Sequence, residues 1–365
     1  MREALTFDDV CLVPRYNNVD SRTEPDLGTW LTKNLKVGMP LVPANMDTVI
    51  GSELAQVIIR NDGIPIFHRF TNFETQKSWV NELVGKAVLS CGVGKFDEVS
   101  RLVDLGPVGI CIDVAHGHSD QMVRMVGDIK KHYPSVEVIA GNVCTARAYH
   151  DLVNAGADAV KVGIGPGAAC TTRMVTGFGV PQFTAIRDCA EEAQHFRVPI
   201  IADGGIRNSS DAVKALAAGA STVMMGKIFA LTEESAAEKR MGYSTSWRLK
   251  EKFARFTDAE RAQIVCDETM VEPVPSGREA KYRGQASEDF QNEFYGGLKH
   301  KTVAEGTDFW APVEGRAQEV IDNFLGGLRS GMTYAGARDI KELQRKAEFV
   351  KVTKAYEAES NPRRE

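Results

Sequence analysis

The chain has 365 residues, of which 43% are hydrophobic and 25% charged, so it is long and apolar enough to bury a large core and is not an intrinsically disordered protein. Its 44 basic and 49 acidic residues give a net charge of -5, which argues against a nucleic-acid partner held through its phosphates. No stretch approaches the roughly 18 apolar residues that span a membrane, so we expect no membrane partner.

The seven cysteines are odd in number, scattered, and without a C-x-x-C pair. This pattern argues against a disulfide framework and against a structural zinc site. The N-terminus also lacks the apolar run of a signal peptide. We therefore expect a soluble, cytoplasmic protein.

Short apolar runs with turn residues at their ends recur along the chain and predict eight strands, over 40–43, 64–67, 87–91, 108–113, 136–140, 159–162, 199–203 and 222–226. Helical spacing between them predicts helices that include 52–61, 118–133, 146–155 and 209–218. Nearly continuous apolar strands are typical of a parallel sheet buried on both faces. Eight such units within about 190 residues favour a single-domain (β/α)8 barrel. The alternative is an open doubly wound sheet, although no G-x-G-x-x-G start is present.

In such a barrel the functional side chains lie at the carboxyl ends of the strands and share one mouth. Those ends carry Asn45, Asp47, His68, Asp113, Asn142, the loop 163–173, Asp203, Gly204, Gly205, Gly226 and Lys227.

The loop 161–173 sets Cys170 in a glycine-rich turn directly after a buried strand. Glycines at positions 163, 165 and 167 let a ligand or an ion approach the main chain. The hydroxyls of Thr171 and Thr172 are proton-relay groups beside the sulfur, so the pattern predicts a nucleophile. The alternative is a tight strand-to-helix turn with a buried thiol.

Gly204, Gly205 and Gly226 follow the seventh and eighth strands, where barrels commonly bind phosphate through backbone N–H groups. Asp203 precedes them and suits the hydroxyls of a ribose. The alternatives are tight turns for the glycines, and a buried carboxylate satisfied by turn amides for Asp203.

Seven stretches together resemble the IMP dehydrogenase/GMP reductase family: Leu5-Thr-Phe-Asp-Asp-Val10, Asp113-Val-Ala-His-Gly-His-Ser119, Ala140-Gly-Asn-Val143, 163–173, Ala202-Asp-Gly-Gly205, Val223-Met-Met-Gly226 and Gly326-Gly-Leu-Arg-Ser330. The resemblance implies a barrel, usually a homotetramer, whose Cys170 attacks C2 of a purine nucleotide (GMP or IMP). It also implies a nicotinamide cofactor that exchanges a hydride at that carbon. A potassium ion is implied as well, bound by the backbone carbonyls of Gly165, Gly167 and Cys170.

Within the family, the chain resembles GMP reductases more than dehydrogenases. The regulatory insert that dehydrogenases usually carry after the second strand is absent, because the second helix runs directly into the third strand near Val88. The Arg-Tyr pair that dehydrogenases place in a mobile flap is missing between Gly284 and Glu305. The run 296–306 is instead similar to the reductase segment that supplies a catalytic glutamate, here Glu305. This resemblance implies NADPH as cofactor and reductive deamination of GMP to IMP and ammonia.

The residue roles carried over from the family fall into three groups. The implied catalytic residues are Cys170, Thr172 and Glu305. The implied nucleotide-binding residues are Asp203, Gly204, Gly205, Gly226, Lys227, Tyr282, Gly284 and Gln285. The implied cofactor-binding residues are Asp113, Ala115, Asn142 and Arg173. The alternatives are a solvated flap carboxylate for Glu305 and a helix cap near Ser119 for Asp113.

Four positions depart from the family pattern: Ala168 stands for a phosphate-binding serine, Lys227 for serine or glycine, Gln285 for the methionine of a Tyr-x-Gly-Met motif, and Thr302 for an arginine of the reductase flap. They leave open a non-catalytic nucleotide-binding relative, or an enzyme that acts on another purine nucleotide. An IMP dehydrogenase without the insert is the other alternative, and a flavin-binding barrel is a more remote one.

The chain is expected to form one catalytic domain over 1–365. We expect an inserted segment at 239–278 with an amphipathic stretch at 246–265, a nucleotide-binding loop and flap at 279–312, and a mobile tail at 353–365. The stretch 341–352 has a helical pattern.

Overall fold

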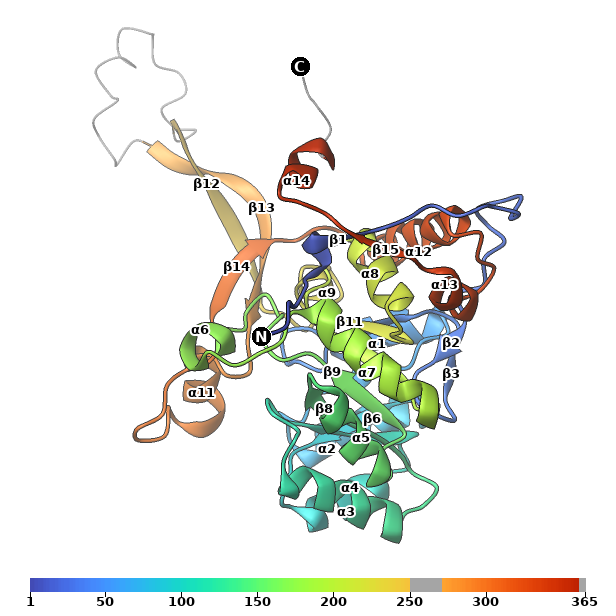
Figure 1. Ribbon diagram of the computed structural model, residues 1–365. Coiled ribbons are helices and arrows are strands. Elements are labelled where there is room, and N and C mark those ends of the chain that lie inside the picture. The colour runs from blue at the N-terminus through green and yellow to red at the C-terminus, as the bar shows by residue number, and fades with distance from the viewer. Residues whose placement is uncertain (250–270, 361–365) are drawn as a thin grey trace, which may run out of the picture.

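The centre of the molecule is a sheet of eight strands arranged as a barrel (Figure 1). The computed structural model describes residues 1–249 and 271–360. The eight predicted strands are all confirmed, with bounds β4 (Leu41–Pro43), β5 (Ile66–Phe67), β6 (Val88–Cys91), β7 (Gly109–Asp113), β8 (Glu137–Val143), β9 (Ala159–Val162), β10 (Ile200–Asp203) and β11 (Thr222–Met225).

The order of these strands decides the fold class. Hydrogen bonding runs β4-β11-β10-β9-β8-β7-β6-β5, and every one of these ladders is parallel. Neighbours in the sheet are neighbours in the chain, and the last strand returns to the first, which yields a nearly closed barrel. A doubly wound sheet would reverse its order at a switch point. The prediction of a (β/α)8 barrel is therefore confirmed.

Helices cover the outside of the barrel (Figure 1). They are α1 (Ser52–Arg60), α2 (Phe73–Glu82), α3 (Phe96–Val103), α4 (Asp120–His132), α5 (Ala146–Asn154), α7 (Gln182–Phe196), α8 (Ser209–Ala217) and α12 (Ala317–Tyr334). The four helices named from the sequence are confirmed to within two residues at each end. Asn72, Ser119, Thr145 and Asn208 each accept the backbone N–H three residues on, which sets the helix starts. Ser119, not Asp113, is thus the cap of α4.

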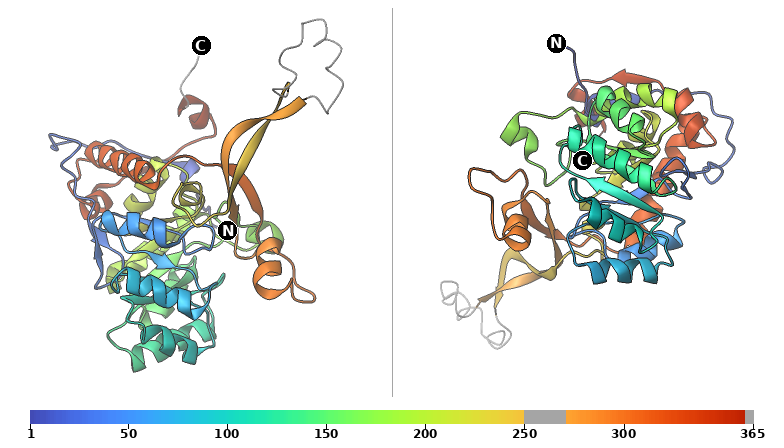
Figure 2. Two further views of the ribbon diagram at one scale, coloured as in Figure 1. Left: turned by 180° about the vertical axis from the view of Figure 1, so that it is seen from behind. Right: turned by 90° about the horizontal axis from the view of Figure 1, so that it is seen from below.

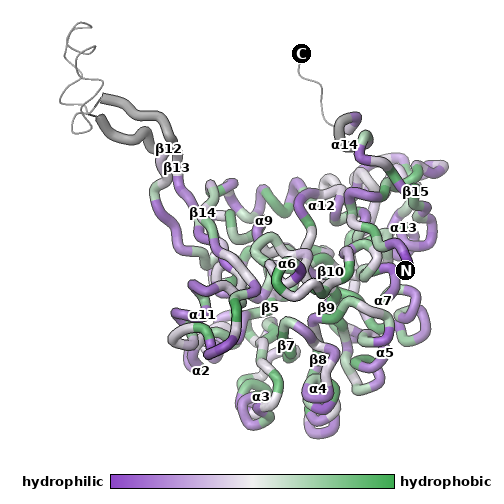
Figure 3. The backbone as a smooth tube through the Cα atoms, turned by 60° about the vertical axis from the view of Figure 1, so that its left-hand side comes forward, coloured by the Kyte–Doolittle hydropathy of each residue, from purple (hydrophilic) through white to green (hydrophobic). Residues whose placement is uncertain are grey.

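Hydrophobic residues predominate in the barrel strands, much of whose tube is green in the hydropathy colouring of Figure 3. Every residue of β6, β9 and β11 is buried, as expected for strands covered on both faces. The polar exception in β9 is Lys161, whose side chain lies inside the barrel. Within residues 1–249 and 271–360, none of the helices combines the length and apolar character that crossing a membrane requires.

The two ends of the chain meet in an antiparallel pair, β1 (Val10–Leu12) with β15 (Phe349–Lys351). The predicted helix at 341–352 is therefore confirmed only in its first half, the helix α13 (Ile340–Lys346). The second half pairs with β1 as a strand. The short helix α14 (Ala355–Ser360) follows within the predicted mobile tail, whose last residues, 361–365, lie outside the described part. The mobility of that tail stays a prediction.

The remaining elements lie outside the barrel. At the N-terminal side are a 3-10 turn, η1 (Phe7–Asp9), and a small sheet of β2 (Thr29–Trp30) and β3 (Lys36–Val37). Close to the mouth are the short helices α6 (Thr172–Thr176), α9 (Lys227–Ala230) and α11 (Glu288–Tyr295).

A long antiparallel hairpin projects from the barrel in every view (Figures 1 and 2). It consists of β12 (Lys239–Leu249) and β13 (Val271–Arg283), and the base of β13 also pairs with β14 (Asp308–Pro312). The described parts of the predicted inserted segment, 239–249 and 271–278, both belong to the strands of this hairpin. The first part of the predicted amphipathic stretch is strand, and residues 250–265 lie outside the described residues.

Candidate active site

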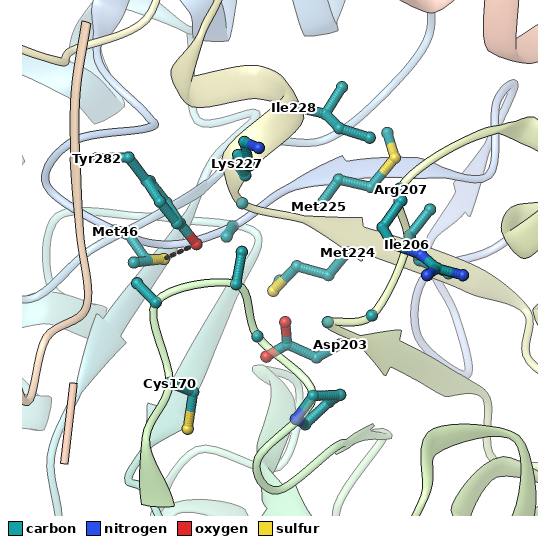
Figure 4. A pocket seen from close by; sticks show the side chains of 18 of the residues that line it. Met46, Cys170, Asp203, Ile206, Arg207, Met224, Met225, Lys227, Ile228 and Tyr282 are labelled. Carbon is teal, nitrogen blue, oxygen red and sulfur yellow. Dashed lines mark hydrogen bonds between the residues drawn. The ribbon is translucent and has the colours of Figure 1, made fainter. Parts of the chain in front are cut away.

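Two adjacent cavities open at the carboxyl ends of the strands, and Cys170 lines both of them. The first, of about 320 Å³, lies over β10 and β11 (Figure 4). The second, of about 200 Å³, is lined by residues from the ends of β7, β8 and β9. The thiol of Cys170 is only partly buried, which excludes the alternative of a core cysteine. A group in this position can react with one bound molecule while a second approaches from the neighbouring cavity.

The loop that carries Cys170 has a conformation that only glycine permits. Gly163 has a φ of +153°, and a Cβ there would lie 2.0 Å from the carbonyl oxygen of Asp203. Gly165 has a φ of +87° and packs against the side chain of Arg173. The guanidinium of Arg173 donates to the carbonyls of Ile164, at 3.3 Å, and Val180, at 2.6 Å. The loop is therefore held rigidly in front of the strand ends.

Cys170, Thr172 and Glu305 form a chain of hydrogen bonds. The Cys170 thiol donates to Thr172 Oγ1 at 3.3 Å, and this hydroxyl donates to Glu305 Oε2 at 3.0 Å. A proton leaving the sulfur therefore has a path through a hydroxyl to a carboxylate, which is how a weak nucleophile is activated. Glu305 is half-buried and bonded, so the alternative of a freely solvated flap carboxylate does not describe it.

Glu305 is also fixed through its backbone. Its carbonyl accepts from the N–H of Thr171 at 2.9 Å, and its own N–H donates to the carbonyl of Ala286 at 3.0 Å. The N–H of Thr307 donates to the carbonyl of Ala169, also at 2.9 Å. The segment around Glu305 is thus bonded to both sides of Cys170.

The first cavity contains most of the predicted nucleotide-binding residues: Asp203, Gly204, Gly205, Gly226, Lys227, Tyr282 and Gly284. In Figure 4 the hydroxyl of Tyr282 points toward Met46, and its hydrogen bond to the Met46 sulfur is 3.7 Å long. Gly204 and Gly205 both have positive φ, at +90° and +79°. The eighth predicted residue, Gln285, lies at the second cavity instead, where its Nε2 donates to the carbonyl of Asn45 at 2.8 Å.

Two cations border the first cavity. Lys227 is exposed at the start of α9, with Nζ 5.8 Å from the ring centre of Phe309. Arg207 also lines the cavity, although the sequence did not single it out, and it is ion-paired with Asp8 and Asp211. The signal in the sequence that could have identified Arg207 is its position two residues after the glycine pair Gly204-Gly205. Both cations suit an anionic group over β10 and β11.

The second cavity contains three of the four predicted cofactor-binding residues, Asp113, Ala115 and Asn142. Asn142 donates to the carbonyl of Gly163 at 2.8 Å and to Asp203 Oδ2 at 2.9 Å. Asp203 is therefore satisfied by side chains and not by turn amides. Arg173 is not among the described residues that line either cavity. Its role toward a cofactor stays a prediction.

The backbone carbonyls predicted to bind potassium have chemistry that suits such an ion. The carbonyls of Gly165, Gly167 and Cys170 are neutral oxygen donors on one loop, and such donors suit an alkali-metal ion. The Gly167 carbonyl accepts one hydrogen bond, from the Cys170 N–H at 3.1 Å, and keeps a second lone pair. Among residues 1–249 and 271–360, no three His, Cys, Asp or Glu side chains gather as a metal site. The residues present therefore fit a monovalent cation better than a transition metal.

Arg283 ties the segment that holds Glu305 to the barrel. Its Nε donates to Asp47 at 2.9 Å, and its Nη1 donates to Asp289 at 2.7 Å and to Glu293 on α11. Burial raises the pKa of Asp47, although the Arg283 cation opposes the shift. Next along the chain, the N–H of Gly284 donates to Thr307 at 3.0 Å. Arg283 therefore anchors the backbone on which Glu305 rests.

We expect Arg283→Met to lower the turnover number roughly 10- to 100-fold, because Glu305 loses its anchored position while the chemistry is otherwise intact. The variant should also unfold at a lower temperature, since Asp47 keeps its buried charge without a partner. Initial rates and thermal unfolding measure both effects. Arg240→Met is the matched control, because Arg240 pairs with Glu279 and stacks on Trp310 in the exposed hairpin. A wild-type rate in Arg283→Met would show that Arg283 does not position Glu305.

Known proteins with similar sequences carry two related activities in their names. A model of the IMP dehydrogenase / GMP reductase domain matches residues 4–363. The inosine-5'-monophosphate dehydrogenase of Cryptosporidium parvum is 36% identical over 408 residues, which cover 98% of this chain and 94% of that protein. That of Borreliella burgdorferi is 34% identical over 416 residues, covering 99% and 97%. GMP reductase 2 of Bos taurus is 33% identical over 361 residues, covering 96% and 94%.

Dehydrogenase names are the more numerous among these relatives, and the identities of the two groups overlap. The match extends over nearly the whole chain, and the barrel and the cysteine loop agree with it. This chain is a member of the IMP dehydrogenase/GMP reductase family of oxidoreductases, which act on purine nucleotides.

Proposed function

We propose that this protein is a GMP reductase, which converts GMP, NADPH and two protons into IMP, NADP⁺ and ammonium. The observation that carries the proposal is the contact of Glu305 with Thr172 beside Cys170. Removing an amino group from C2 requires a nucleophile at that carbon and an acid for the departing nitrogen. The chain of three side chains supplies both functions at one place.

The proposed reaction begins when Cys170 adds to C2 of GMP and its proton passes through Thr172 to Glu305. The same carboxylic acid then returns a proton, by way of the hydroxyl, to the 2-amino group, which leaves as ammonia. A positioned acid and base of this kind contribute typically about 10²–10⁴ in rate. The purine is left bonded to the sulfur of Cys170 through C2.

NADPH, bound in the second cavity, supplies the hydride that this carbon needs. Asp113 and Asn142 at that cavity would bind hydroxyl and amide groups of the dinucleotide. Cys170 then departs as the thiolate, so that C2 of IMP carries hydrogen in place of the amino group. A potassium ion on the loop carbonyls would stabilise the conformation of residues 163–173.

The phosphate of the nucleotide is proposed to lie over β10 and β11. Gly204, Gly205 and Gly226 line that end of the first cavity, with Lys227 and Arg207 beside them. Lys227 would replace the missing hydroxyl contact at Ala168, since an ammonium binds phosphate well. Asp203 would accept the ribose hydroxyls. A homotetramer is proposed on the resemblance alone, and light scattering of the purified protein measures it.

The second candidate is an IMP dehydrogenase, favoured by the names of most similar relatives. It would have to activate water for attack on the cysteine-bound purine. The segment 285–304 contains no arginine to do so. Thr302, at the position of the reductase arginine, is exposed and donates to the carbonyl of Lys299 at 2.6 Å. The choice between GMP and IMP as the substrate therefore needs a direct assay.

The test is the absorbance of reduced nicotinamide with purified protein, GMP and NADPH in potassium buffer, together with ammonia release. A parallel reaction contains IMP and NAD⁺. Loss of absorbance and stoichiometric ammonia with GMP are the expected result. Gain of absorbance only with IMP and NAD⁺ would assign the dehydrogenase activity instead. Inactivity in both reactions would point to another purine nucleotide, and xanthosine and adenosine monophosphates would be assayed next.

A further inference from the structure

A buried lysine lies beneath the boundary between the two cavities. Lys161 is on β9, and its side chain is only 2% exposed. Its Nζ donates to Asp113 Oδ1 at 2.7 Å, to Asn45 Oδ1 at 3.1 Å and to Asp203 Oδ2 at 3.3 Å. An ammonium has three N–H donors, so all of them are used. The reaction proposed above gives this residue no role.

The two carboxylates that Lys161 binds face different cavities. Asp113 lines the second cavity, whereas Asp203 lies at the border and lines the first as well. Each gives one oxygen to the lysine. Among the described residues, none donates a hydrogen bond to Asp113 Oδ2 or to Asp203 Oδ1. These oxygens remain available to hydroxyl groups of ligands, one in each cavity.

The charges at this junction do not cancel. Burial by itself lowers the pKa of Lys161, but the nearby charges of Asp113 and Asp203 outweigh burial and raise it, so the lysine stays a cation. One positive charge therefore interacts with two negative charges, in a site largely closed to water. Without it, the two carboxylates would repel each other at low dielectric, and neither would keep its orientation.

We propose that Lys161 is a positioning residue that couples the two cavities, so that the purine nucleotide and the nicotinamide dinucleotide each strengthen the binding of the other. The identity of the two ligands rests on the proposed function. A hydroxyl that donates to one carboxylate disperses its charge and weakens its hold on the ammonium. The ammonium then binds the other carboxylate more closely and fixes it for the second ligand. The coupling is a property of binding and needs no turnover.

The experiment measures the dissociation constant of GMP by calorimetry, with and without saturating NADP⁺. The oxidised dinucleotide prevents reduction, so both ligands stay intact. In the wild type we expect NADP⁺ to tighten GMP binding about fivefold or more. In Lys161→Met this factor should fall to near one, with both ligands bound more weakly. Lys161→Arg keeps the positive charge and should restore part of the factor.

Lys130→Met is the matched control. Lys130 is a partly buried lysine that pairs with Asp158 at 2.8 Å and with the carbonyls of Pro134 and Val136, near the amino ends of β8 and β9. Its loss removes a lysine–aspartate pair of the same kind outside the site. We expect lower thermal stability but an unchanged coupling factor.

Asp113→Asn is a second variant, which tests the proposal even if Lys161→Met does not fold. Its side chain is neutral but can still form hydrogen bonds. Because Asp113 lines only the second cavity, a purely local role predicts no change in GMP affinity. Our proposal predicts tighter GMP binding in the absence of dinucleotide, by about three- to tenfold, and a coupling factor near one, since Lys161 then binds Asp203 alone, as it would when a ligand occupies Asp113. An unchanged GMP affinity in this variant, or an unchanged factor in folded Lys161→Met, would overturn the proposal, as would a wild-type factor of one.

The same titrations are repeated with IMP and NADH, a pair that neither candidate activity converts, so both ligands again stay intact. This arm separates the inference from the proposed function. Coupled binding without NADPH oxidation by GMP would refute the reductase assignment and leave the role of Lys161 standing. NADPH oxidation by GMP without coupled binding would support the reductase assignment and refute the role of Lys161.

Discussion

Replacing Cys170 with alanine will abolish turnover while the protein still binds its purine nucleotide. The thiol lies on the wall of both cavities and has a proton acceptor within reach, in Thr172 Oγ1 at 3.3 Å. Loss of the nucleophile of a covalent mechanism costs at least about 10⁴ in rate, because the remaining interactions do not replace bond formation. Steady-state rates and calorimetric nucleotide binding measure the two parts of this prediction.

The other cysteines provide the control. Cys144 lies at the end of the neighbouring strand β8, is half-buried, and has a pKa raised by burial. Burial likewise raises the pKa of Cys111 to about 12, which keeps that thiol protonated and unreactive. Cys144→Ala should therefore keep the wild-type rate. Alkylation mapped by mass spectrometry should modify Cys170 first and be slowed by bound nucleotide. Residual activity in Cys170→Ala above one hundredth of the wild type would rule out a covalent path through this sulfur.

Replacing Glu305 with glutamine will lower the turnover number about 10²–10⁴-fold and leave the Michaelis constant nearly unchanged. The amide has the shape of the carboxylate and still accepts from Thr172 Oγ1, so the flap stays in place. In the proposed reaction it cannot take up the proton that leaves the thiol or return it to the departing amino group. The defect therefore belongs to the chemical step and not to binding.

Glu288→Gln is the control, because Glu288 is an exposed carboxylate at the start of α11 in the same part of the chain. It should have the wild-type rate. Thr172→Ala should lower the rate by a similar factor to Glu305→Gln, and the double variant should be little worse than either one, as expected for groups that act as one relay. Additive losses in the double variant would show that the two side chains act in separate steps.

The architecture of the barrel was predictable because its information is local. The runs 159–162 and 222–226 are short, largely apolar and end beside or at a glycine, Gly163 and Gly226, and a helical pattern follows several of the strands. Such patterns depend on neighbours within a few residues, and connection rules then leave a parallel barrel as the favoured arrangement. The helix and strand bounds agree for this reason.

The pattern failed where pairing partners are distant in the chain. Residues 349–351 have helical spacing in sequence but form β15, because β1 offers them an exposed edge about 340 residues earlier. The beginning of the amphipathic stretch at 246–249 is likewise strand, since β12 pairs with β13. In both cases tertiary pairing outweighs a weak local preference.

In the candidate site too, the features that depend on local sequence were predictable and those that depend on distant contacts were not. The sequence by itself determined the glycine loop, Cys170 with its threonine neighbours, and the glycines after β10 and β11, because each depends on backbone angles and spacing that are local. Only the tertiary structure decided that Glu305 meets Thr172 across 133 residues and that Arg283 anchors it to Asp47 across 236. It also decided that Lys161, an ordinary strand residue in the sequence, points inward and shares its charge between Asp113 and Asp203. The reason is that the sequence gives only the order of the side chains along the chain. The curvature of the barrel decides which of them come within contact distance of one another.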